Sequence, residues 1–388
     1  MSEKLISLSP DLQRLRAEGY EIEIKGTILL VYNVPYVNTN KEISPGTLVC
    51  LLNISGEQLL GPADHTIYFK GDSPCDKDGS ILNAIVNNSV KKDLGYGVVA
   101  DHYFSAKPPS GNYPDYFEKI ETYVSHLESQ AQALNPVVTA RTGKVIESKE
   151  QDVVFKYLNP SPSCIELEVV TKELRDLKVV IIGLGGAGSY ILDFIAKTPV
   201  KEIHLFDGDI FVSKNAFRAP AAASVETLRQ MLKKVNYYSD MYSNIHKHVV
   251  PHDCYVTPAV FDELLSMDFV FICIDKGDAR KLIVQKLTGL LIPFIDVGMG
   301  VNLENGKVSG SVRTTLVTKE KNDHIELRIP FTDEGENEYN KNIQIVELNA
   351  LNAAIAVIKW KKYFNFYHDL TAESHSIYET NVNKVIND

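Results

Sequence analysis

A glycine-rich stretch between a hydrophobic run and a helical one constrains the fold of this chain more than any other feature. It reads IIGLGGAGSY at residues 181–190, and Gly183, Gly185 and Gly188 satisfy the spacing G-x-G-x-x-G. Glycines at these positions permit a tight turn, and they let backbone amides approach a phosphate at the positive end of the following helix. We expect a nucleotide-binding turn between a buried strand and a helix.

Buried-strand runs alternate with helical stretches from residue 178 onward. The strand runs are KVVIIG, EIHLFD, DFVFICID and IPFIDVG, and helices are expected at 189–198, 278–287 and about 343–363. This alternation predicts an α/β fold with a Rossmann-like, doubly wound sheet that has helices on both faces. The apolar residues of the last helix suit either the core or a dimer interface.

The first 145 residues follow a different pattern. Short strand-like runs (EIEIKGTILLVYNVPYV, GTLVCLLNI and HTIYF) alternate with turns rich in Gly, Pro, Asn and Asp, and a helix is expected at 116–133. We predict a small α+β domain at 1–145, which recruits a substrate or partner. A nucleotide-binding domain at 146–388 is expected to follow it.

Charge and composition exclude several kinds of partner. A net charge of −10 disfavours binding to nucleic acid or to an anionic membrane. The apolar runs are too short to cross a bilayer, and the start of the chain has no secretory signal, so we expect a cytoplasmic protein. The five cysteines form no CxxC pair, so no structural zinc is expected.

The glycine turn alone leaves a dinucleotide and ATP open as ligands. Asp207, about 20 residues beyond the turn, suits a ribose hydroxyl in both cases. The segment after it, with Asp209, Asn215 and Arg218, favours ATP. A guanidinium and an amide can stabilise charge on phosphoryl oxygens, whereas hydride transfer needs neither. Asp275, at the end of the run DFVFICID, is placed to hold Mg²⁺.

Taken together, these stretches resemble the ThiF/MoeB superfamily of adenylyltransferases, which includes the ubiquitin-activating enzymes. The matching parts are VVIIGLGGAGSY, FDGDIFVSKNAFRAP, a lysine at 234 and FICIDKGDAR, within about 178–301. The resemblance implies catalytic roles for Arg218, Lys234 and Asp275, with Asp275 as the Mg²⁺ ligand and Arg280 in support. The expected nucleotide-binding residues are Gly183, Gly185, Gly186, Gly188, Asp207, Asp209, Asn215, Arg218, Lys234 and Asp275.

The resemblance implies that the chain uses ATP and Mg²⁺ to adenylate the C-terminal carboxylate of a ubiquitin-like protein. It also implies a homodimer. The region 338–367 is similar to adenylyltransferases with an extra N-terminal domain from bacterial ubiquitin-like conjugation operons. That similarity implies a partner conjugating enzyme and a role in antiviral defence against phage. Two other functions stay open, an NAD-dependent oxidoreductase and a non-catalytic nucleotide-binding module.

The sequence departs from the family in three ways. Ala219 stands where the family has glutamine, the paired CxxC motifs are absent, and no cysteine follows Cys273. The chain therefore either stops at the acyl-adenylate, transfers the acyl group directly to a nucleophile of a partner, or transfers it to a residue elsewhere in its own sequence. We expect Cys75 to be exposed in a polar turn, where neighbouring aspartates raise the pKa of its thiol. On this basis no thioester is expected on the chain's own cysteines.

Overall fold

The computed structural model describes residues 5–6, 8–56, 58–145, 153–157, 171–332 and 344–388. The chain divides into two compact units. One comprises Met1–Glu147 with Tyr157–Leu167, and the other comprises Ser148–Lys156 with Glu168–Asp388. The expected domain boundary, between 145 and 146, lies at the edge of the described residues. The cysteine at 164 lies outside them.

The first unit is the predicted α+β region, built on one antiparallel sheet. The order of its strands is β1 (Glu21–Lys25), β2 (Ile28–Val37), β3 (Ile43–Leu51), β6 (Thr66–Lys70), β10 (His102–Ser105) and β7 (Val86–Asn88). Two short hairpins accompany it, β4 (Ile54–Ser55) with β5 (Gln58–Leu59) and β8 (Lys92–Asp93) with β9 (Val99–Ala100). The apolar sides of helices α2 (Pro10–Ala17) and α3 (Tyr116–Leu134) share a core with this sheet. Helix α3 begins where Asp115 accepts a hydrogen bond from the Glu118 amide, as a helix N-cap does.

The second unit is built on a sheet of eight strands among the described residues. Their order is β13 (Val249–His252), β12 (Glu202–Phe206), β11 (Lys178–Ile182), β14 (Phe269–Ile272), β15 (Phe294–Glu304), β16 (Lys307–Val317), β17 (His375–Glu379) and β18 (Lys384–Asn387). The first five are parallel, which confirms the predicted Rossmann-like sheet. The last three run antiparallel and were not expected, and neither was β13.

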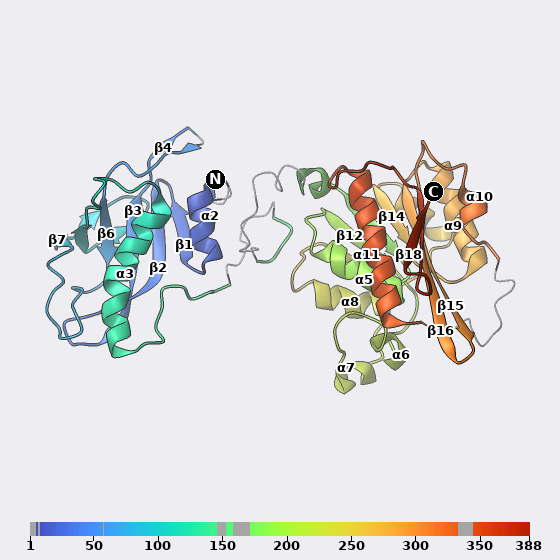
Figure 1. Ribbon diagram of the computed structural model, residues 1–388, viewed down its shortest axis with the longest axis horizontal. Helices are drawn as coiled ribbons and strands as arrows, with labels where there is room; N and C mark the ends of the chain where they lie inside the picture. Colours follow the sequence, from blue (N-terminus) through green and yellow to red (C-terminus); the bar gives the residue numbers. More distant parts are fainter. Residues whose placement is uncertain (1–4, 7, 57, 146–152, 158–170, 333–343) are drawn as a thin grey trace. The chain divides into compact units, whose positions relative to one another are not determined.

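Helices cover both faces of this sheet, as predicted (Figure 1). Helices α5 (Gly186–Ala196), α8 (Lys234–Tyr242) and α11 (Val346–Tyr363) share one hydrophobic cluster with the sheet. The 3₁₀ helix η1 (Pro258–Leu264) and helix α9 (Gly277–Gly289) share another. Three short helices complete the unit, α6 (Ser213–Ala216), α7 (Val225–Arg229) and α10 (Ile325–Arg328). No helix within the described ranges is both long and apolar enough to cross a membrane.

Helix α11 uses its apolar side inside the unit. Its buried residues include Leu348, Ala353, Ala356 and Trp360, and they pack against α5 and the sheet. Of the two roles that the sequence left open for this helix, the structure therefore shows the core role.

A histidine between α8 and β13 is fully buried in its neutral form. The amide of His248 donates to Nδ1 of His246 over 3.1 Å, so the ring proton is on Nε2, which donates to the carbonyl of Val200 over 2.9 Å. The ring of Phe155 packs edge-on against it, with the ring centres 5.9 Å apart. Burial lowers the pKa of His246 to about 4, in spite of the hydrogen bond to Val200.

We expect His246 to make the second unit acid-sensitive. An unfolded histidine titrates near pH 6.5, so below that pH the unfolded chain takes up a proton that the folded chain refuses until about pH 4. The free energy of unfolding should fall by about 3 kcal/mol across this window on account of His246 alone. Urea unfolding followed through the fluorescence of Trp360, the chain's one tryptophan, measures it. His246→Gln should reduce the slope between pH 6.5 and 4, and an unchanged slope would contradict the assignment.

Candidate functional site

The glycine turn joins β11 to α5 and packs tightly against the chain that follows β14. Gly183 has a φ of +89°, and a Cβ on it would lie 2.7 Å from the carbonyl oxygen of Cys273. A Cβ on Gly188 would collide with the carbonyl oxygen of Gly183. Only glycine fits these two positions without strain. The turn therefore delivers the first amides of α5, which have no intrahelical partner, to the carboxyl end of the sheet.

Asp207 connects this turn to the end of β12. One carboxylate oxygen accepts the Leu184 amide over 2.7 Å, and the other accepts the Asp209 amide over 2.8 Å. The ammonium of Lys234, at the start of α8, lies 3.1 Å from Oδ2 of Asp207. Asp207 and Lys234 are 6% and 5% exposed, so this ion pair is buried and needs these hydrogen bonds to offset its desolvation.

Asp209 extends the ion pair toward the surface. Its Oδ2 lies 2.7 Å from the Lys234 ammonium, and its Oδ1 accepts the Tyr255 hydroxyl over 2.5 Å. Burial alone would raise the pKa of Asp209, but the hydrogen bonds from Lys234 and Tyr255 outweigh it and hold the pKa below its ordinary value. The same bond to Asp209, with some burial, raises the pKa of Tyr255 to about 12. Tyr255 belongs to no sequence motif, so the sequence did not predict that it is part of the site.

Asn215 and Arg218, the two motif residues near α6, differ in their hydrogen bonding. Asn215 is buried, and its Oδ1 accepts the Val212 amide over 3.0 Å, so it holds the turn at the start of α6. Arg218 follows the helix and is half-buried. Its Nε is buried without a hydrogen-bond partner among the described residues. An unpaired guanidinium nitrogen at this place has capacity for an anionic ligand.

Asp275 is exposed, and it lies beyond the end of β14 rather than inside the strand, which stops at Ile272. Arg280 holds the backbone just before Asp275, because its Nη2 donates to the Ile274 carbonyl over 2.5 Å. Its Nε lies 3.2 Å from Oδ1 of the buried Asp296. Arg280 therefore shapes the segment that carries Asp275.

The described residues hold no group of three or more side chains that could bind a metal. Mg²⁺ is usually held by one or two carboxylates with phosphate oxygens and water, so a single carboxylate such as Asp275 fits it.

These residues meet at one end of the sheet. Strand β11 lies between β12 and β14, so the strands that follow it in the chain are added first on one side of β11 and then on the other. Ligands of doubly wound sheets bind at the carboxyl ends of the strands where the order reverses in this way. The glycine turn follows β11, Asp207 follows β12, and the segment of Asp275 follows β14. Arg218 and Lys234 come from the connection between β12 and β13.

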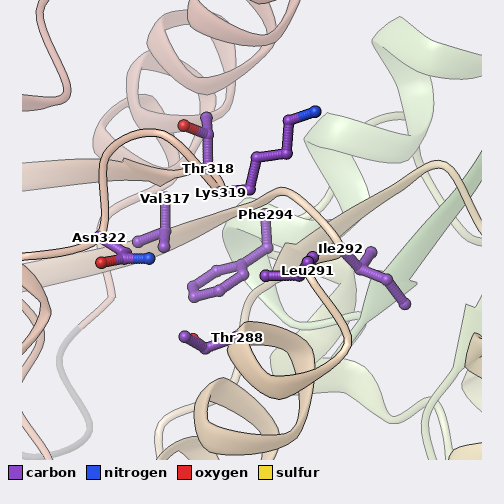
Figure 2. Close-up of a pocket in the computed structure, with 8 residues that line it drawn as sticks. All are labelled: Thr288, Leu291, Ile292, Phe294, Val317, Thr318, Lys319 and Asn322. Atoms are coloured by element: carbon purple, nitrogen blue, oxygen red, sulfur yellow. The ribbon is translucent and has the colours of Figure 1, made fainter.

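A small hollow elsewhere in this unit does not coincide with the site. Figure 2 shows the eight residues that line it, around the end of α9, the start of β15 and the end of β16. Its volume is about 180 Å³, open solvent included. Phe294, which lines it, begins β15, so the hollow lies at the amino ends of the parallel strands, opposite the candidate site.

The prediction that Cys75 is exposed is wrong. Cys75 is 0% exposed, its amide donates to the Val37 carbonyl over 2.7 Å, and it packs with Val37 and Ala131. Burial raises the pKa of its thiol, and Asp76 adds to the effect. Burial is also the main cause that raises the thiol pKa of the other described cysteines, Cys50, Cys254 and Cys273. Cys273 lies just after the end of β14 and is partly accessible.

Comparison with protein-family models gives two matches. A model described as a domain of unknown function (DUF6791) matches residues 10–160. The model of the ThiF family matches residues 164–358, half of the chain. The chain belongs to the ThiF family. The ThiF match covers the glycine turn and every candidate site residue above.

Curated relatives match about half of the chain. The chain is 22% identical over 212 residues to a "Ubiquitin-like modifier-activating enzyme 5" from Aedes aegypti, covering 49% of this chain and 52% of the relative. It is 26% identical over 184 residues to an "Adenylyltransferase and sulfurtransferase uba4" from Aspergillus fumigatus, covering 46% and 37%. The chain thus spans about half the length of the first of these relatives, and less of the second.

Solved structures similar to this ThiF-family chain include E. coli MccB with MccA-N7isoASN, at 17% identity and a TM-score of 0.47. That match covers 57% of this chain and 66% of the MccB chain. A structure of PaaA is similar at 18% identity and a TM-score of 0.46, covering 57% and 75%.

Proposed function

We propose that this ThiF-family chain adenylates the C-terminal carboxylate of a ubiquitin-like protein, with ATP and Mg²⁺. The observation that carries the proposal is the buried Asp207–Lys234 ion pair, which the exposed Asp209 extends and the Leu184 amide ties to the glycine turn. The names of the curated relatives, a ubiquitin-like modifier-activating enzyme and an adenylyltransferase, support the same reaction.

The candidate residues divide the work of holding ATP. The first amides of α5 bind phosphate oxygens, and the carboxylate of Asp207 accepts a ribose hydroxyl. Lys234 and Arg218 supply positive charge to the phosphates, and Asn215 orders the turn that carries Arg218. Asp275 holds Mg²⁺, which when bound neutralises part of the phosphate charge. With these contacts the site only has to align a carboxylate with the α-phosphorus and stabilise the charge that develops.

The experiment that tests the proposal has two stages. Thermal shifts of the purified protein with ATP and with NAD separate an adenylyltransferase from an NAD-dependent oxidoreductase. Pyrophosphate exchange is then measured with ATP, MgCl₂ and ubiquitin-like proteins that the chain captures in a pull-down. This measurement separates an enzyme from a non-catalytic nucleotide-binding module. Stabilisation by NAD and not by ATP would overturn the proposal.

Arg218→Ala should lower the rate of pyrophosphate exchange by about 10²-fold or more while changing ATP affinity less. The reason is that its unpaired Nε is expected to meet phosphoryl charge that develops during the reaction. Exchange kinetics with calorimetric ATP titration measure the two effects. Lys214→Ala is the matched control, because Lys214 is an exposed cation on α6, the short helix that Arg218 follows, and it should change neither. Equal losses in affinity and rate would mark Arg218 as a plain binding residue.

We further propose that the chain works as two domains, 1–145 for recruitment and 146–388 for adenylation. A homodimer, a partner conjugating enzyme and a role in antiviral defence belong to the same proposal. They rest on the family resemblance, and the burial of α11 inside its own unit gives the homodimer no additional support.

The chain should form no thioester on its own cysteines, and a variant with all five replaced by alanine or serine, if folded, should still form the acyl-adenylate. The raised thiol pKa values of the four described cysteines leave little thiolate near neutral pH. Denaturing gels with and without thiol, after incubation with ATP and the substrate, measure this. A thiol-sensitive covalent band that disappears in Cys75→Ala would disprove the prediction. A thiol-resistant, hydroxylamine-sensitive band would indicate an oxyester.

A further inference from the structure

Two asparagines on one side of α11 are buried, although neither belongs to a sequence motif. Asn349 is 2% exposed and Asn352 is 1% exposed. Nδ2 of Asn352 donates to the carbonyl of Gly298 on β15 over 2.9 Å. Nδ2 of Asn349 is buried without a hydrogen-bond partner in the described ranges. A buried donor left unpaired is costly and uncommon in folded proteins, so Asn349 requires an explanation.

The position of Asn349 relates it to the glycine turn. Gly186 is the first residue of α5, and a Cβ built on it would collide with the Asn349 amide. The missing side chain at Gly186 therefore makes room for Asn349 at the first turn of α5. Helices α5 and α11 pack side by side, as Figure 1 also shows. The unpaired amide thus lies against the helix N-terminus where free backbone N–H groups favour an anion.

The order of the strands indicates which part of a nucleotide Asn349 can reach. Asp207, the candidate ribose ligand, follows β12 on one side of β11. Helix α11 packs against β15 and β16, which lie on the other side of β11. Between these two sides lies the first turn of α5. Asn349 is therefore placed at the phosphate end of the nucleotide and away from its ribose.

We propose that Asn349 is a further nucleotide-binding residue, whose Nδ2 donates a hydrogen bond to the α-phosphate of the bound nucleotide. The inference rests on the proposed function, because it assumes that the glycine turn holds an adenine nucleotide. It explains both the unpaired donor and the space left at Gly186. A purely structural explanation is that Asn349 pairs with Asn352, whose Oδ1 is also buried and unpaired among the described residues.

The test compares Asn349→Leu with the matched control Asn352→Leu. Leucine is close to asparagine in shape but forms no hydrogen bond, so it removes the amide and largely keeps the packing. Calorimetry measures the affinities of ATP, AMP and adenosine, and thermal melting measures the stability of the protein without ligand. Asn349→Ala makes the same comparison if leucine does not fit.

Asn349→Leu should weaken ATP and AMP binding by about tenfold or more, because the lost hydrogen bond is to a charged acceptor. It should leave adenosine affinity unchanged, and melting of the free protein should stay the same or rise. Asn352→Leu should lower the melting temperature, since the Gly298 carbonyl loses its donor, and should not change AMP affinity relative to adenosine.

Equal AMP affinity in wild type and Asn349→Leu would overturn the inference and leave the proposed function intact. Equal melting losses in the two variants, with no change in selectivity for AMP over adenosine, would favour the structural pair and also overturn it. Failure of the wild-type protein to bind any of the three ligands would overturn the proposed function as well.

Discussion

Lys234→Met should destabilise the second unit by about 3–5 kcal/mol and abolish ATP binding. The substitution leaves the carboxylate of Asp207 buried without its cation, and Asp209 loses its 2.7 Å contact with the same ammonium. Methionine keeps the unbranched side chain as far as Cε and removes only the ammonium, so the loss is mainly electrostatic. Urea unfolding followed through Trp360 and calorimetric ATP titration measure the two effects.

The neighbouring lysine provides the control. Lys233 has a side chain that is 38% exposed and an ion pair with Asp253 at 3.2 Å. Exposed pairs contribute little, so Lys233→Met should cost about 1 kcal/mol or less. Adding Asp207→Asn to Lys234→Met should restore part of the stability, because the buried charge is gone, but not ATP binding. Equal losses in the two lysine variants would contradict the importance assigned to the buried pair.

Asp275→Asn should remove the Mg²⁺ dependence of ATP affinity and reduce pyrophosphate exchange about 10³-fold or more, as expected when a metal that stabilises phosphoryl charge is lost. The fold should be unaffected, because Asp275 is exposed and lies outside the strand. Calorimetric ATP titrations with MgCl₂ and with EDTA measure the metal dependence, and exchange assays measure the rate.

Asp278→Asn is the matched control for this variant. Asp278 is an exposed carboxylate in the first turn of α9, three residues further along, and it should tolerate the change. An ATP affinity in Asp275→Asn that still increases with Mg²⁺ as in the wild type would exclude Asp275 as the metal ligand.

The sequence predicted those elements whose residues are buried in long runs. The helix expected at 116–133 is α3, Tyr116–Leu134, because its apolar residues recur at helical spacing. Strand β13 was missed because it is short and contains Pro251. The antiparallel strands β16 to β18 carry polar or exposed residues at many positions, so they lack a continuous apolar run.

The candidate site was partly predictable because its motif residues have fixed spacings. In the structure the side chains of Asp207 and Asp209 both contact that of Lys234. The spacing of these residues in the sequence did not predict how close their side chains lie. Tyr255 and Asn349 come from segments without any motif, and only the packing of β13 and α11 places them there. The polar neighbours of Cys75 suggested exposure, but the backbone bridges to Val37 and Ile81 bury it instead.

The contact between Gly183 and Cys273 has a thermodynamic consequence. The glycine turn and the segment that leads to Asp275 touch so closely that a Cβ would lie 2.7 Å from the opposite carbonyl. Neither segment can shift without displacing the other. If a nucleotide settles on the turn and a metal on Asp275, their binding free energies are therefore coupled. Linkage requires this coupling to be reciprocal, so Mg²⁺ increases ATP affinity by the same factor by which ATP increases Mg²⁺ affinity.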